Sequence, residues 1–131
     1  MSTPKRTLWM PGDAQGGPFN VWETAEDIDY DGVKCKGLCE VTAGRRDDIS
    51  VSAKQGLAQM KQTLLHEQMH KCWGTASGDL REFILGEKTP EKRARREELI
   101  TSFLEPVLYD LLARNGWLKY PDPPAFRRGR R

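Results

Sequence analysis

Apolar residues recur every three or four positions in two stretches of the chain, and this spacing is typical of helices with one buried face. The first stretch predicts a helix over residues 53–73. A Ser-x-x-Gln capping box formed by Ser52 and Gln55 is expected to start it, and Gly74 is expected to cap its C-terminal end. This helix carries the apolar residues Leu57, Met60, Leu64, Leu65, Met69 and Trp73.

The second stretch predicts a longer helix that begins at Pro90, with Thr89 as its cap, and ends at Asn115-Gly116. Its apolar stripe is centred near Ile100, Leu104 and Leu111, and we expect that stripe to face the core. Pro106 is expected to kink this helix, because proline removes a backbone donor and clashes one turn back.

Short β-type segments precede the two helices. They cover residues 19–23, 33–42 and 48–52, and Asp31-Gly32 between the first two is a hairpin signal. Prolines and glycines are frequent in residues 1–18, which predicts an irregular N-terminal arm with at most a short strand around Leu8–Met10. The expected organisation is therefore this arm, one domain over residues 19–120, and a basic flexible tail over residues 121–131.

Composition favours a folded domain, since 37% of the 131 residues are hydrophobic and 31% are charged. No apolar run is long enough to cross a bilayer, and no signal-peptide pattern is recognisable at the start. Three cysteines without an export signal predict reduced thiols and a cytoplasmic location. The net charge of +2 depends on the tail, whose arginines are Arg127, Arg128, Arg130 and Arg131.

The candidate chemistry lies in the first predicted helix. The only two histidines of the chain form the motif His66-Glu67-Gln68-Met69-His70, which is H-E-x-x-H. Two histidines four apart on a helix share one face, so both imidazoles can reach one Zn²⁺ ion. Zinc lowers the pKa of a water towards 7, and Glu67 is placed to take its proton as a general base. The alternative is an ordinary pair of histidines at the edge of the core.

A third zinc ligand has to be a carboxylate, because no further histidine exists and the residues after the motif exclude a metzincin. Glu97 and Glu98 open the apolar part of the second helix. On a helical wheel Glu97 lies about 55° from the centre of the apolar stripe and Glu98 about 155° away. Glu97 is therefore the expected ligand and Glu98 is expected to face solvent, although a solvated Arg-Glu cluster is the alternative.

The motif with its surroundings resembles the minimal gluzincin-type metallopeptidases, often encoded by bacteriophages and related to the SprT-like and ImmA/IrrE-like zincins. The matching segments are Asp48–Ser52, Thr63–His70 and Glu97–Ile100. The resemblance implies an α+β, zincin-like fold with a small twisted sheet packed on the motif helix. It also implies that residues 48–52 form an edge strand that aligns a peptide or protein substrate. The zinc ligands would be His66, His70 and Glu97, with Glu67 as the base.

The expected function is hydrolysis of peptide bonds by a zinc peptidase in the cytoplasm, or in the host cytoplasm if the protein is phage-encoded. No residue in the sequence could be assigned to stabilise the oxyanion. Two alternatives therefore stay open. One is a catalytically silent, zinc-stabilised binding protein, such as a phage particle component or a regulator. The other is a protein that contacts nucleic acid through its arginine tail.

Overall fold

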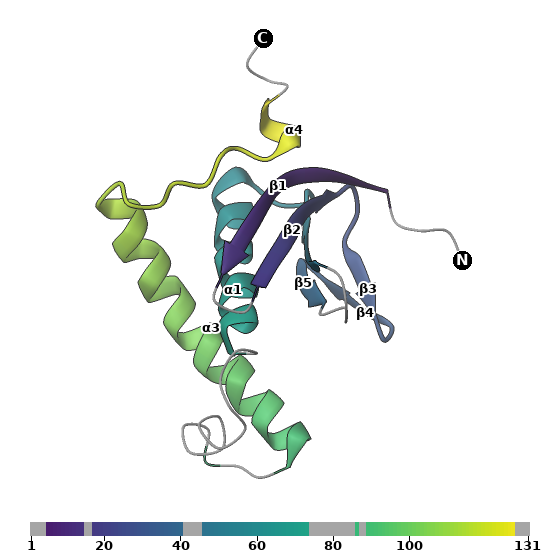
Figure 1. The fold of residues 1–131 in the computed structure, drawn as a ribbon, viewed down its shortest axis with the longest axis vertical. Helices are drawn as coiled ribbons and strands as arrows, with labels where there is room; N and C mark the ends of the chain where they lie inside the picture. The colour runs from purple at the N-terminus through teal and green to yellow at the C-terminus, as the bar shows by residue number, and fades with distance from the viewer. Residues whose placement is uncertain (1–4, 15–16, 41–45, 74–85, 87–88, 128–131) are drawn as a thin grey trace.

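The structure is a computed structural model that describes residues 5–14, 17–40, 46–73, 86 and 89–127 (Figure 1). It is a mixed α+β fold. Six strands and three helices are described: β1 (Arg6–Ala14), β2 (Gly17–Thr24), β3 (Ile28–Tyr30), β4 (Val33–Cys35), β5 (Gly37–Glu40), β6 (Asp47–Ser52), α1 (Leu57–Trp73), α3 (Pro90–Arg114) and α4 (Pro124–Arg127).

Four strands form the main sheet, in the order β1-β2-β6-β5. β2 and β6 are parallel, while the two outer pairs are antiparallel. β3 and β4 form a separate hairpin. Helix α1 packs on the sheet through β5 and β6, and α3 packs on α1 (Figure 1). The fold thus places α1, which carries the motif, between the sheet and α3.

The apolar core lies between the sheet and α1. It is formed by Trp9, Phe19, Val21, Ile49, Val51, Met60 and Leu64. Alternate residues of β2 point to this core, as the period of two along a strand requires. The predicted amphipathic face of α1 is confirmed, since Met60 and Leu64 are fully buried.

The turn predicted at Asp31-Gly32 is confirmed as the link between β3 and β4. Asp31 has φ 52° and Gly32 has φ 79°, the left-handed backbone that two-residue hairpin turns of type I′ require. Asp29 supports the turn, because its Oδ1 accepts a hydrogen bond from the Gly32 amide at 3.1 Å. The strand β3 itself was missed by the sequence pattern.

The predicted capping box of α1 is wrong. Ser52 belongs to β6 and pairs with Thr24, and the helix begins only at Leu57. The Ser52 hydroxyl donates to Asp27 and accepts from the Lys54 amide, so it closes a turn between strand and helix. The residue expected to end the helix, Gly74, lies outside the described residues.

Helix α3 begins and ends as predicted. Thr89 accepts a hydrogen bond from the Lys92 amide, Pro90 is the first helical residue, and the helix passes through Pro106 to Arg114. The predicted inward face is wrong, however. The fully buried residues of α3 are Thr101 and Glu105, whereas in the predicted stripe Leu104 and Leu111 are exposed and Ile100 is only half-buried.

The predicted irregular arm over residues 1–18 is also wrong. Residues 6–14 form β1, which pairs with β2 along its length and buries Trp9 in the core. Pro11 and Gly12 are accommodated because β1 is an edge strand, where proline costs no ladder hydrogen bond on its free side. A register shift between Leu8 and Met10 adds a local irregularity.

The predicted flexible tail is wrong for residues 121–127, which dock on β1 and β2. Trp9 Nε1 donates to the Pro121 carbonyl at 3.0 Å, and the Arg127 guanidinium donates to the Trp9 carbonyl at 2.9 Å. Pro123 is fully buried. Arg127, one of the arginines of the predicted nucleic-acid contact, therefore helps to hold residues 121–127 on the sheet. The others, Arg128, Arg130 and Arg131, lie outside the described residues. None of the helices in the described part of the chain is long and apolar enough to cross a membrane.

Candidate metal centre

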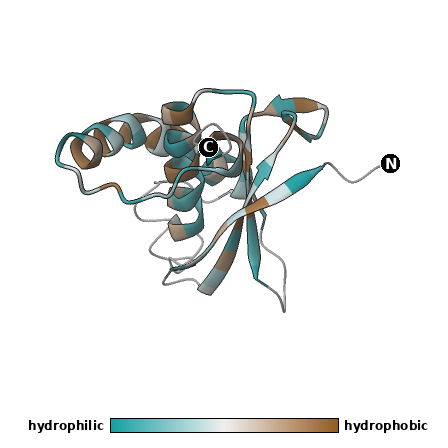
Figure 2. Cartoon of the chain, turned by 90° about the horizontal axis from the view of Figure 1, so that it is seen from above, coloured by the Kyte–Doolittle hydropathy of each residue, from teal (hydrophilic) through white to brown (hydrophobic). Residues whose placement is uncertain are grey.

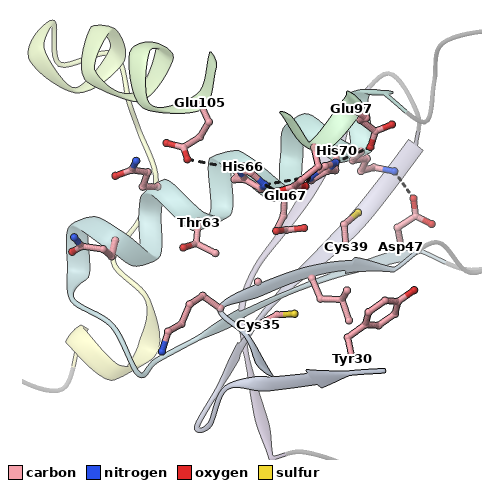
Figure 3. Close-up of a pocket in the computed structure, with 17 residues that line it drawn as sticks. Tyr30, Cys35, Cys39, Asp47, Thr63, His66, Glu67, His70, Glu97 and Glu105 are labelled. Carbon is pink, nitrogen blue, oxygen red and sulfur yellow. Dashed lines mark hydrogen bonds and ion pairs between the residues drawn. The ribbon is translucent and has the colours of Figure 1, made fainter. Parts of the chain in front are cut away.

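The two motif histidines lie one turn apart on α1 and point towards α3 (Figure 3). Their Nε2 atoms are 3.2 Å apart, and their side chains are 17% and 18% exposed. Two neutral imidazoles each have one nitrogen with a lone pair. The pair therefore presents two nitrogen donors to one point beside the helix.

Glu98 of α3 completes this group. Its Oε1 lies 3.1 Å from His66 Nε2, and its Oε2 lies 2.6 Å from His70 Nε2. Ligands held at about 2.0–2.1 Å by a tetrahedral zinc ion are about 3.4 Å from one another. The spacing of the three donors is close to that value, and a His₂Glu set suits zinc. His66, His70 and Glu98 are thus close enough to bind one metal ion.

The structure brings Glu98, rather than the expected Glu97, to the two Nε2 atoms. Glu97 is the more buried side chain, at 14% exposed against 56%, as the helical wheel predicted. Its carboxylate, however, lies against the other nitrogen of His70, with Oε2 2.7 Å from Nδ1. Glu97 therefore contacts the Nδ1 side of the His70 ring, whereas Glu98 contacts the Nε2 side, where a metal ion would bind.

The orientation of α3 explains this difference. The helical wheel assumed that the apolar stripe faces inward, but α3 turns Thr101 towards α1, where its hydroxyl accepts a hydrogen bond from Trp73 Nε1 at 3.1 Å. Residues three or four apart on a helix share a face, so Glu98 and Glu97 both lie on the side of Thr101 that faces α1. The sequence gives the angular positions of the residues around α3, but not the rotation of α3 about its own axis when it packs on α1.

Glu105 is a further site residue that the sequence pattern did not identify. Its Oε1 lies 3.7 Å from His66 Nδ1, and its Oε2 is buried with no hydrogen-bond partner among the described residues. Each histidine therefore has a carboxylate on its Nδ1 side, but only the contact of Glu97 with His70 is within the hydrogen-bond distance that orients metal-binding imidazoles. The available signal was spacing, since residue 105 is seven positions, or two turns, after Glu98.

Glu67 projects from α1 into the neighbouring cleft, on the side that faces β5 (Figure 3). Burial raises the pKa of its carboxyl group, and the negative charge of Glu98 adds to this, although the charges of His70 and His66 act against it. For His70, burial lowers the pKa, but the hydrogen bond to Glu97 and the nearby carboxylates of Glu67 and Glu98 outweigh burial and raise it.

Gly37, the first residue of β5, makes room for Glu67. A Cβ atom at Gly37 would lie 2.5 Å from Thr63 Cγ2, closer than real Cβ contacts, and 3.0 Å from Glu67 Cγ, which is tighter than most. Strand and helix can be this close only because residue 37 has no side chain. The glycine thus fixes where Glu67 stands relative to the strand.

The cleft beside Glu67 has a volume of about 1200 Å³. Its walls come from α1, α3, β5 and the β3–β4 hairpin, whose Tyr30 faces the cleft (Figure 3). At one end Lys71 forms a buried ion pair with Asp47 at 2.5 Å. The cleft is therefore lined by both apolar and charged groups, next to the candidate metal centre.

The cysteines do not form a second metal group among the described residues. None of the three forms a disulfide, and Cys35 and Cys39 line the cleft. Burial, followed by the negative charges of Glu67 and Asp47, raises the pKa of Cys39 to about 11. Cys39 is therefore a protonated thiol at neutral pH.

No protein-family model matches the chain, and neither a curated protein nor a solved structure matches it. The resemblance to gluzincins thus rests on the motif, its helix and the grouped side chains alone.

Proposed function

We propose that this protein is a zinc-dependent peptidase of the minimal gluzincin type. The observation that carries the proposal is the meeting of Glu98 with the Nε2 atoms of His66 and His70, in the wall of a cleft that also holds Glu67. Three donors suited to zinc and one free carboxylate are the groups that a His₂Glu hydrolase requires.

His66, His70 and Glu98 would hold the ion, in place of the set with Glu97 expected from the sequence. Zinc, when bound, polarises a substrate carbonyl and lowers the pKa of a water molecule. Glu97 would keep the His70 imidazole oriented through its Nδ1 side, and Glu105 lies on the Nδ1 side of His66 at 3.7 Å. Glu67 would accept the proton of the attacking water and deliver it to the leaving amine.

The substrate in this proposal is an extended peptide that adds to the edge of β5 that pairs with no other described strand. The sequence predicted that residues 48–52 would be this edge, and that prediction is wrong, because β6 is paired on both sides, with β2 and β5. β5 is the last strand of the sheet, and its residues 37–39 line the cleft beside Glu67. An added strand gains backbone hydrogen bonds there without a requirement for particular side chains.

For the oxyanion-stabilising group, which no residue of the sequence could be assigned to, we propose Tyr30. Its phenol ring lines the cleft from the β3–β4 hairpin, opposite α1. A phenol is a donor suited to a developing negative charge.

The test measures zinc content and hydrolysis together. Elemental analysis of the purified chain after zinc loading should give about one zinc per molecule, and a mixture of fluorogenic peptides should report cleavage. Glu67→Gln should keep the zinc and lose cleavage, because Gln cannot accept a proton. Glu91→Gln, at an exposed glutamate on α3, is the control and should keep both.

The outcomes separate the alternatives. Zinc binding without cleavage of any peptide in the mixture would favour the silent, zinc-stabilised protein. A Glu67→Gln variant that cleaves as well as the wild type would contradict the mechanism. If the wild type binds no zinc after loading, the motif would be only an ordinary pair of histidines on a helix. The free thiols are compatible with the proposed cytoplasmic location.

A further inference from the structure

The outer edge of β5 presents the backbone groups of Gly37 and Cys39. The Lys36 carbonyl, just before β5, accepts a hydrogen bond from the Ser52 amide at 2.8 Å, so these two residues form a hydrogen-bonded pair of the antiparallel ladder. Such pairs recur at every second residue, and Leu38 therefore also turns its N–H and C=O towards β6. The N–H and C=O groups of Gly37 and Cys39 point the other way, to the edge where no other described strand pairs.

The side chains of β5 alternate between the two faces of the sheet. A Cβ atom at Gly37 would meet Thr63 and Glu67 of α1, and Cys39 packs against the core. Both positions thus face α1. Leu38 lies between them and faces the opposite side, yet it also lines the cleft. The cleft therefore extends around the edge of β5 to the face of the sheet that is turned away from α1.

On that face the wall of the cleft is apolar. The β3–β4 hairpin lies beside the main sheet in Figure 1 and in Figure 2. It is on the face of Leu38, because Ser52, whose side chain shares this face, donates to Asp27 just before β3. Leu38 is half-buried and Tyr30 of the hairpin is 55% exposed, so both offer apolar surface to a ligand. The nearby ammonium group of Lys36 is neutralised by Asp27 at 2.9 Å.

An extended peptide that pairs antiparallel with β5 would place one residue opposite Leu38. The residues on either side of it would exchange hydrogen bonds with Gly37 and Cys39, so this residue belongs to a non-hydrogen-bonded pair. The Cα atoms of such a pair are only about 4.5 Å apart, and the two side chains lie on the same face. The side chain opposite Leu38 would therefore pack against it, on the side of the sheet where the hairpin lies.

We propose that the substrate carries a large apolar residue opposite Leu38, at a fixed position next to the cleaved bond or one residue from it. The position follows from Glu67, since a Cβ atom at Gly37 would lie 3.1 Å from Glu67 Oε2. The peptide residue that pairs with Gly37 is thus the one nearest to the general base. This inference rests on the proposed peptidase function and names the substrates of that site.

The positions of the cleaved bonds test the subsite. The zinc-loaded full chain is incubated with a tryptic digest of a cell proteome, and mass spectrometry identifies the bonds that it cleaves. Leucine, isoleucine, phenylalanine and methionine should be enriched about tenfold over serine at the fixed position. Cleavage without such enrichment would overturn the inference and leave the peptidase proposal intact.

Leu38→Lys should change the preference and not only weaken it. The introduced ammonium group would attract an acidic side chain, so aspartate and glutamate should replace the apolar residues at the same position. Leu38→Ser should reduce the apolar preference about tenfold. Leu8→Ser is the matched control, because Leu8 is 45% exposed on β1, at the opposite edge of the same sheet, and it should keep the preference. An apolar preference that both Leu38 variants retain would overturn the inference.

A binding measurement separates this inference from the peptidase proposal. Zinc-loaded Glu67→Gln, which should bind peptides without cleaving them, is titrated against two fluorescein-labelled threonine heptapeptides with leucine or serine at the centre. Fluorescence anisotropy should give a dissociation constant about tenfold lower for the leucine peptide. If the wild type cleaves no peptide and this difference is found, the peptidase proposal fails and the subsite stands. Equal dissociation constants, or no binding of either peptide, would overturn the subsite.

Discussion

Glu97 accepts a hydrogen bond from Nδ1 of His70 at 2.7 Å, and this contact fixes which nitrogen of the ring can bind a metal. An ionised carboxylate can only accept, so with a metal ion on Nε2 the Nδ1 atom would carry the proton that Glu97 accepts. Glu97 thus has a positioning role, different from that of its neighbour in the chain, Glu98.

The two glutamates should respond differently to removal. Glu98→Ala should lose zinc, because it removes a ligand, while Glu97→Ala should keep about one zinc and bind it about 10–100-fold more weakly. Competition with a chelator, followed by elemental analysis, measures both. Zinc lost from Glu97→Ala and retained by Glu98→Ala would restore the ligand set that the sequence favoured.

Gly37→Ala should lower both stability and hydrolysis. The added methyl group would overlap Thr63 and Glu67, so β5 and α1 must separate. Overpacking of this kind costs about 1–3 kcal/mol, which thermal unfolding can measure. Gly56→Ala is the control, because its Cβ would meet only the flexible end of Gln59, at 3.3 Å. Equal losses in the two variants would contradict a specific role for Gly37.

Cys39 should react slowly with iodoacetamide at pH 8 and faster as the pH rises. Its pKa of about 11 leaves roughly one thiolate per thousand molecules at pH 8, and the thiolate is the reacting form. The rate should rise about tenfold per pH unit up to pH 11. Peptide mapping by mass spectrometry distinguishes it from the exposed Cys72. A rate at Cys39 that is flat between pH 8 and 10 would contradict the raised pKa.

Tyr30→Phe should lower kcat of the zinc-loaded enzyme about 100-fold and leave KM and zinc content nearly unchanged. The change removes only the phenolic hydroxyl, and loss of one oxyanion donor typically has this size of effect. Steady-state kinetics on a cleaved peptide provides the measurement. An equal loss from Val33→Ala, on the same hairpin, would indicate that the hairpin acts by its shape alone.

Local patterns predicted the parts of this fold that local physics controls. The start of α3 at Thr89-Pro90 and the hairpin at Asp31-Gly32 depend on few neighbouring residues, and both are confirmed. The interior position of β6 was missed because β2 pairs with it from a distant part of the sequence. The position of Glu98 was missed because a hydrophobic stripe does not always face the core of its own chain.

The contacts of Trp9 have a consequence for the order of folding. This core residue needs the Pro121 carbonyl for its indole N–H and the Arg127 guanidinium for its own carbonyl. Neither group exists until the ribosome has translated more than a hundred further codons. The β1 edge of the sheet is therefore completed only after synthesis of residue 127, and a nascent chain that stops earlier would expose an unfinished edge strand.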